Sequence, residues 1–146
     1  MASVNLYLNF TDTCEAAFTF YKSVFGGEFE GEGIQRFGEM PPPEGAPPLA
    51  DEVKNLVLHV GLKIMDDFLL MGSDAPKAMG YEVTMGTNMY INLNADSRAE
   101  LRTLFTALSE GGKVEQELQE MFWGDFFGSC IDKFGIKWMF ATTAKM

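Results

Sequence analysis

The sequence predicts an α+β fold of two tandem βαβββ units, whose curved, mostly antiparallel sheets form an open barrel or cup with the helices outside. Three observations predict it. A strand-like segment at 5–10 returns at 88–93, a helix-like segment follows each copy, and a glycine pair ends each helix. Self-similarity at a nearly constant offset indicates a duplicated unit. We expect one domain over residues 1–146, with unit one at about 3–72, a linker at 73–86 and unit two at about 87–143.

Each unit opens with a segment in which polar or aromatic residues alternate with aliphatic ones. A period of two is typical of a strand with two different faces. One face would pack on a helix, and the other would line a cavity or meet solvent. We favour the cavity slightly, because amides and phenols there would supply fixed donors and acceptors in an aromatic pocket. The residues of this polar ladder are Asn5, Tyr7, Asn9, Asn88, Tyr90 and Asn92.

A helix signal follows each first strand. Asp12 with Glu15, and Ser97 with Glu100, place an N-cap residue three positions before a glutamate, as in a capping box. Apolar residues then recur at three- and four-residue spacing and give each helix one apolar stripe. Glycine takes up the left-handed cap conformation at little cost, so the helices are expected to end at the glycine pairs 26–27 and 111–112.

The remaining strands are expected in the same order in both units. Glutamate-rich second strands, read as solvated faces, are followed by two strands joined by a tight turn. A proline-rich loop at 38–52 interrupts unit one only. The expected strands lie at about 28–37, 53–64 and 68–72 in unit one, and at about 113–122, 126–131 and 136–142 in unit two, with turns at 65–67 and 132–135.

The composition limits the partners. The formal net charge of −10 would repel a nucleic-acid backbone or an anionic membrane. No apolar run approaches the ~20 residues of a membrane-spanning helix, and the start of the chain does not resemble a signal peptide, which favours the cytoplasm. Cys14 and Cys130 are too few for a disulfide framework or a four-cysteine zinc site, so we expect them in the core. A small organic molecule is the expected partner.

Five strings run in order along nearly the whole chain: YLNF at 7–10, AAFTFY at 16–21, LMGSD at 70–74, FWGD at 122–125 and DKFGIKWM at 132–139. They resemble the vicinal-oxygen-chelate (glyoxalase/bleomycin resistance/dihydroxybiphenyl dioxygenase) superfamily, and within it the PhnB-like branch. Members of this branch are often described as 3-demethylubiquinone-9 3-methyltransferases. That activity needs a nucleotide-sized cofactor site, usually a glycine-rich turn between a strand and a helix of a parallel sheet. The sequence contains no such element.

The resemblance also implies where a catalytic metal would bind. Metal-dependent members place His, Glu or Gln on the inward faces of the first and last strands of each unit. The matching positions fall at or near Asn5, Asn88 and Met139, and the segment 68–71 offers only apolar residues. Because amides and thioethers are poor ligands for divalent metals, we predict no catalytic metal and no other cofactor. A divalent metal is the less favoured alternative.

Two further residues complete the expected ligand-binding set. His59 is the sole histidine and follows the same strand alternation. Imidazole can act as acid or base near neutral pH, but a lone strand histidine is more often a hydrogen-bonded structural residue, so we treat it as ligand-lining and name no catalytic residue. Trp123 is a candidate pocket wall, whereas the neighbouring phenylalanines 122, 126 and 127 are expected to pack in the core or an interface.

These observations favour a small-molecule-binding protein without a catalytic metal. One alternative is a metal-dependent lyase, isomerase or dioxygenase of the same superfamily. Another is a dimeric assembly protein without a ligand. A homodimer is expected in any case, since relatives commonly pair and exposed sheet edges need protection. Whether the chain is an enzyme is left open by the sequence.

Overall fold

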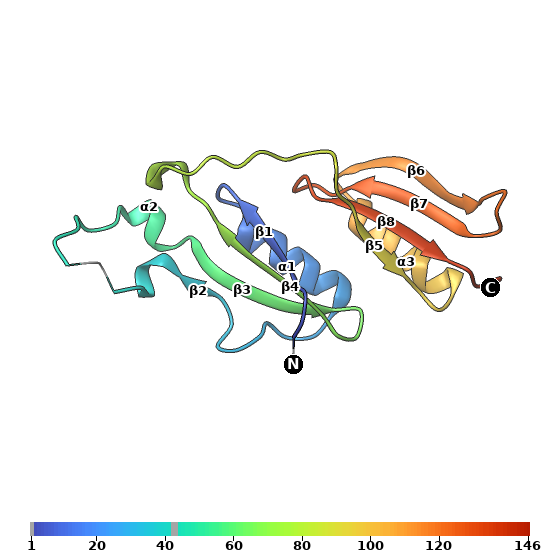
Figure 1. The fold of residues 1–146 in the computed structure, drawn as a ribbon, viewed down its shortest axis with the longest axis horizontal. Helices are drawn as coiled ribbons and strands as arrows, with labels where there is room; N and C mark the ends of the chain where they lie inside the picture. Colours follow the sequence, from blue (N-terminus) through green and yellow to red (C-terminus); the bar gives the residue numbers. More distant parts are fainter. Residues whose placement is uncertain (1, 42–43) are drawn as a thin grey trace. The chain divides into compact units, whose positions relative to one another are not determined.

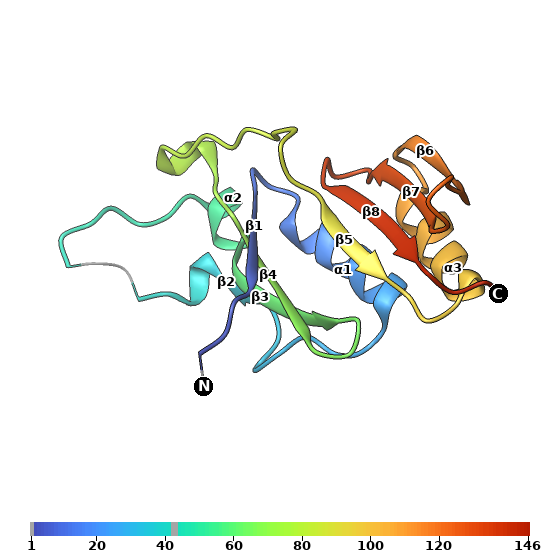
Figure 2. The ribbon, with the colours of Figure 1, turned by 45° about the vertical axis from the view of Figure 1, so that its right-hand side comes forward.

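The computed structural model describes residues 2–41 and 44–146. The chain divides into two compact units, Met1–Thr84 and Met85–Met146. Each unit holds a four-stranded sheet with a twelve-residue helix packed on one face (Figure 1, Figure 2). The strand and helix order in both units is βαβββ. The predicted α+β class and the duplicated unit are therefore confirmed.

Unit one has the strand order β1-β4-β3-β2. The pair β1–β4 is parallel, and the other two pairs are antiparallel. Its elements are β1 (Leu6–Phe10), α1 (Cys14–Phe25), β2 (Gln35–Arg36), β3 (Val57–Ile64) and β4 (Phe68–Asp74), with the short helices η1 (Phe37–Glu39), α2 (Asp51–Lys54) and η2 (Lys77–Met79).

Unit two repeats this topology with the order β5-β8-β7-β6. Its only parallel pair among the described residues is β5–β8. The elements are β5 (Ile91–Asn94), α3 (Arg98–Ser109), β6 (Lys113–Glu120), β7 (Phe126–Ile131) and β8 (Lys137–Thr142).

The core of each unit lies between its sheet and its helix. In unit one, the Phe18 ring of α1 fits over Gly72 of β4, where an added Cβ would lie 2.5 Å from the ring. In unit two, Phe105 of α3 meets Phe140 of β8 edge-to-face, with ring centroids 5.1 Å apart. Trp138 is fully buried beside it and donates its indole N–H to Asp132 at 2.8 Å. Each such buried side chain contributes about 1.5–3 kcal/mol.

The two cysteines are buried free thiols, as predicted. Burial raises the pKa of Cys14, and it raises the pKa of Cys130 to about 12. Both thiols therefore stay protonated at neutral pH, and a protonated thiol is a weak nucleophile.

A buried carboxylate joins three elements of unit one. Asp74, at the end of β4 and 3% exposed, accepts hydrogen bonds of 2.9 Å from the backbone N–H groups of Cys14 and Val57. Cys14 begins α1 and Val57 begins β3. The pKa of Asp74 is raised, chiefly by burial, and the two backbone donors only partly oppose this rise. Because the bonds to a charged acceptor are strong, this residue fixes where both elements start.

The capping prediction holds for one helix only. The Ser97 hydroxyl accepts the Glu100 N–H at 3.1 Å and caps α3. The Asp12 cap is wrong: the N-cap residue of α1 is Thr13, without a side-chain cap bond. Asp74, sixty residues along the chain from Cys14, satisfies that helix end instead.

Several strand boundaries differ from the prediction, three of them by more than two residues or in the kind of element. The expected strand 28–37 is reduced to a bridge at Phe29 and the two residues of β2, because positive φ angles at glycines 31 and 33 interrupt it. Residues 53 and 54, expected at the start of a strand, instead end α2, which begins at residue 51 of the expected loop. β5 begins only at Ile91, so Asn88 and Tyr90 precede it. The tight turn at 65–67 is confirmed, with positive φ at Met65 and Asp66.

Replacement of Asp74 by asparagine should destabilise the protein by about 1–3 kcal/mol, because the amide keeps one acceptor and leaves one buried N–H unsatisfied. Urea unfolding followed by circular dichroism measures the change. Asp66→Asn, in the exposed β3–β4 turn, is the matched control and should leave stability nearly unchanged. A wild-type unfolding midpoint for Asp74→Asn would contradict the role assigned to this carboxylate.

Candidate functional site

Each sheet has a face that its own helix does not cover. Residues paired across neighbouring strands point to the same side of a sheet, and successive residues alternate. In unit one, Tyr7 pairs with Met71 and Met71 with Gly61, whereas their neighbours Leu70 and Leu62 are buried towards α1. The helix-free side therefore carries the polar ladder of β1.

Two side-chain pairs form what we call the unit-one face: Tyr7 with His59, and Asn9 with Ser73. The Tyr7 hydroxyl and His59 Nδ1 are 3.2 Å apart, and their rings lie at 5.7 Å. The Ser73 hydroxyl donates to Asn9 Oδ1 at 3.2 Å. These contacts hold four hydrogen-bonding groups from three strands on one surface. His59, which had no partner evident from the sequence, thus has one in Tyr7.

Apolar residues extend the unit-one face beyond these pairs. Met71 lies half-buried beside Tyr7. Gly61, next to Met71, is buried, and the side chains of Leu69, Glu30 and Met71 cover it. Asn5, predicted with this set, is exposed before the start of β1 and contacts only Ser3, at 3.5 Å, among the described side chains. The unit-one face thus joins Tyr7, Asn9 and His59 but not Asn5.

At the equivalent positions of its own sheet, unit two carries a charged group of side chains. We call Tyr90, Glu115 and Lys137 the unit-two cluster. Glu115 accepts the Tyr90 hydroxyl at 2.9 Å on one oxygen and the Lys137 ammonium at 2.8 Å on the other. The ammonium also lies over the Tyr90 ring, 4.6 Å from its centroid. The side chain of Lys137 is 9% exposed and that of Glu115 is 26% exposed.

The charges of this cluster support one another. The Lys137 hydrogen bond, assisted by that of Tyr90, lowers the pKa of Glu115. The Glu115 hydrogen bond in turn raises the pKa of Lys137. The pair is therefore fully ionised at neutral pH.

The other ladder residues of unit two do not join the cluster. Asn92 is exposed on the helix-free side of β5, opposite Met139 of β8. Asn88 is exposed and precedes β5. Of the three ladder residues of this unit, only Tyr90 makes a side-chain hydrogen bond within the described part of the chain.

Trp123 lies away from these residues, in the turn between β6 and β7. It is 52% exposed and meets Phe122 edge-to-face at 4.9 Å. Phe122 is 97% exposed, so it does not pack in the core, and its packing at an interface stays a prediction. Phe126, at the start of β7, is buried as expected. The reason is geometric: the turn at 121–125 points two aromatic rings outward before the strand resumes.

The residues at the expected metal positions do not fit a divalent metal. Met71 and Met139 present thioethers on the helix-free faces, and Asn5 and Asn88 present exposed amides. Hard divalent cations prefer carboxylates, and imidazole suits transition metals. Over residues 2–41 and 44–146, no three His, Cys, Asp or Glu side chains are grouped to hold a metal ion.

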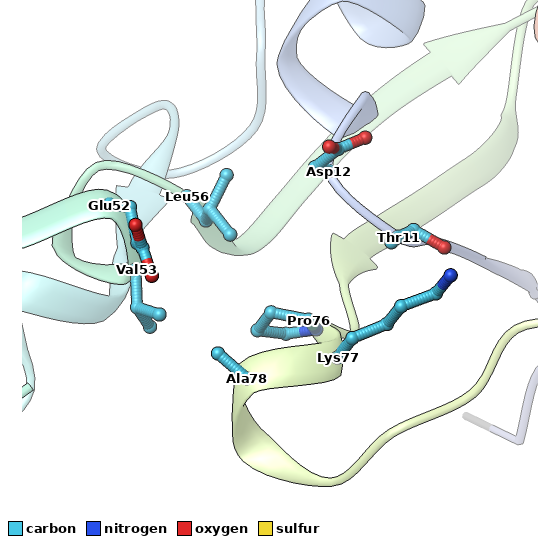
Figure 3. A pocket seen from close by; sticks show the side chains of 8 residues that line it. All are labelled: Thr11, Asp12, Glu52, Val53, Leu56, Pro76, Lys77 and Ala78. Atoms are coloured by element: carbon cyan, nitrogen blue, oxygen red, sulfur yellow. The ribbon is translucent and has the colours of Figure 1, made fainter. Parts of the chain in front are cut away.

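A separate hollow of about 490 Å³ lies where β1 and β4 end (Figure 3). Its walls come from three segments of unit one: the β1–α1 turn, α2 with the residues after it, and the start of η2. The floor is apolar and the rim carries two carboxylates and one ammonium. The lining residues are Thr11, Asp12, Glu52, Val53, Leu56, Pro76, Lys77 and Ala78.

Glu115, Lys137 and Ser73 are the site residues that sequence reasoning missed. The glutamate-rich segment of β6 predicts a solvated face, so Glu115 is not expected in a site. The register of β6 against β7 shifts between Val114 and Gln116, so Glu115 departs from simple alternation. Lys137 could have been found by comparing the two units. It lies in the strand after the 132–135 turn, beside Tyr90, as Met71 lies beside Tyr7 in unit one.

None of the helices in the described part of the chain has the length and apolarity to span a membrane.

The comparisons with known proteins agree over most of the chain. The model of the Glyoxalase/Bleomycin resistance protein/Dioxygenase superfamily matches residues 3–140. The protein YjdN of Escherichia coli K12 is 28% identical over 138 residues, which cover 91% of this chain and 90% of that protein.

Solved structures show the same fold. Protein PA1353 of Pseudomonas aeruginosa is 36% identical, with a TM-score of 0.81 over 97% of this chain and 98% of that one. A PhnB protein of Bacillus cereus, described as a candidate 3-demethylubiquinone-9 3-methyltransferase, is 22% identical, with a TM-score of 0.73 over 97% and 99%.

The stability lost on Lys137→Met should be largest at intermediate pH. Glu115 has a lowered folded pKa, so its contribution is present above its ordinary pKa of about 4.3 and is lost as the pH falls through the lowered value. Lys137 has a raised folded pKa, so its contribution is present below its ordinary pKa of about 10.4 and is lost as the pH rises through the raised value. Urea midpoints of wild type and variant over a pH series measure the difference.

Lys63→Met is the control for this series, because Lys63 is half-exposed and lies 3.8 Å from Glu30 in a looser ion pair. Its effect should be small at every pH, as for most surface ion pairs. If the difference in urea midpoint between wild type and Lys137→Met does not change with pH, the variant acts through packing alone.

Proposed function

The chain belongs to the Glyoxalase/Bleomycin resistance protein/Dioxygenase superfamily, and from that premise we propose that it is a PhnB-like small-molecule-binding protein that works without a catalytic metal. The superfamily scaffold alone does not define an activity, since one fold hosts many functions. The proposal therefore rests on the side chains of the helix-free sheet faces. The observation that carries it is the hydrogen-bonded Tyr7–His59 pair on the unit-one face.

This pair leaves a hydrogen-bonding position for a ligand. The hydroxyl of Tyr7 is hydrogen-bonded to His59 Nδ1. In the described part of the chain no residue hydrogen-bonds the second ring nitrogen, Nε2. Depending on the tautomer, Nε2 donates or accepts. With the half-buried Met71 beside it, the face offers apolar contact next to one oriented polar group, which suits a small aromatic molecule with a hydrogen-bonding substituent.

Methyl transfer is not part of the proposal, although the Bacillus cereus protein is described with that activity. The β1–α1 turn reads Thr11-Asp12-Thr13, and the β5–α3 turn reads Ala95-Asp96-Ser97. Neither contains the glycines that let a strand–helix turn hold the phosphates or adenosine of a nucleotide-sized cofactor.

Neutral aromatic probes, benzamide and indole, should bind the intact protein and perturb the NMR signals of Tyr7, His59 and Met71. His59→Phe keeps a ring but removes both nitrogens, and it should weaken benzamide binding about two- to tenfold, the worth of one hydrogen bond. Tyr81→Phe, at an exposed tyrosine outside this face, is the control and should bind like wild type. Unperturbed signals on the unit-one face with both probes would refute the proposal.

A further inference from the structure

Lys137 holds an unusual place for a lysine. It begins β8 on the helix-free side, opposite the half-buried Ile131 of β7, and its side chain is 9% exposed. Lysine side chains are mostly exposed, because taking an ammonium out of water is costly unless it is paired. Here Glu115 supplies the opposite charge, and the face of the Tyr90 ring supplies a cation–π contact.

The ammonium still has hydrogen-bonding capacity. It carries three N–H donors. Glu115 accepts one of them, and the phenol of Tyr90 lies close enough to raise the pKa of Lys137. Even with the phenol counted as a second acceptor, one donor is left, and no other side chain or carbonyl in the described ranges bonds this nitrogen. An incoming oxygen atom would satisfy it.

The ion pair is not a requirement of the fold, because unit one forms the same sheet without it. Met71 stands beside Tyr7 where Lys137 stands beside Tyr90. Glu30 and Glu115 are each the third residue after a glycine pair, but Glu30 meets Lys63 in an exposed contact of 3.8 Å. The Lys137–Glu115 ion pair beside the tyrosine is thus an addition specific to unit two.

The surroundings of Lys137 are those of a small-molecule site. Ile131 and Met139 are half-buried on the same side of the sheet, and Asn92, opposite Met139, is exposed. Apolar walls with a few oriented polar groups are typical of ligand pockets. A single cation among them selects ligands by charge.

We propose that the unit-two cluster recognises the negatively charged oxygen of a small organic carboxylate through the ammonium of Lys137. The ligand oxygen takes a free N–H of the ammonium, and Glu115 holds the lysine in place while lowering its net attraction for anions. This inference rests on the proposed function, ligand binding on a helix-free face, and adds the charge that the ligand carries.

Phenylacetate and its neutral isostere phenylacetamide test the inference on the intact protein. NMR signals of the Lys137 side chain should shift with phenylacetate, which should bind at least about tenfold more tightly than phenylacetamide, the worth of a charged hydrogen bond. Lys137→Met installs the residue that unit one carries and should remove this preference without changing phenylacetamide binding. Lys63→Met, the matched control, should retain it.

Glu115→Gln separates recognition from structure. It removes the competing carboxylate, so phenylacetate should bind more tightly than to wild type. If Lys137→Met and Glu115→Gln both weaken phenylacetate binding equally, or if phenylacetate leaves the Lys137 signals unmoved, the cluster is a structural ion pair and the inference falls. If benzamide still perturbs the unit-one face in that case, the proposed binding on that face stands and only this inference fails. If phenylacetate shifts the Lys137 signals while neither benzamide nor indole perturbs the unit-one face, the inference stands and the proposed binding on the unit-one face fails.

Discussion

The structure of unit one depends on the carboxylate of Asp74. It lies at the end of β4 and accepts the first N–H groups of α1 and β3, so one side chain sets the relative position of a helix and two strands. A buried carboxylate is stable only with such donors, and it leaves neither backbone group unsatisfied. The position of β3 then determines where His59 lies relative to Tyr7. The unit-one face is thus a distant consequence of this buried interaction.

Duplication has produced two sheets with the same topology and different chemistry. Both helix-free faces carry a tyrosine from the polar ladder, but its partners differ. Tyr7 meets the imidazole of His59 beside a methionine, whereas Tyr90 meets an ion pair. The helix-packed faces of both units are lined by buried apolar side chains, so the two units differ chiefly on the opposite faces. The same scaffold therefore presents an ion pair on the helix-free face of unit two and a tyrosine–histidine pair on that of unit one.

The sequence predicted the elements whose signals are local. Alternation identified most of the strands, and the Ser97 cap marked the start of α3. The failures came from long-range or irregular features. The cap of α1 is supplied by Asp74 from far along the chain, which no local pattern reveals. The charge run of β6 concealed Glu115, because a register shift places it against Tyr90 and Lys137.

The two tryptophans lie in opposite environments, one fully buried in the core of unit two and one in the exposed β6–β7 turn. Indole emission shifts to longer wavelength as water gains access to the ring, so the two fluorophores have separable spectra. Trp138, bonded to Asp132, reports on the integrity of the core. Trp123 reports on whatever approaches the turn. The protein therefore carries its own pair of optical probes, without added dyes.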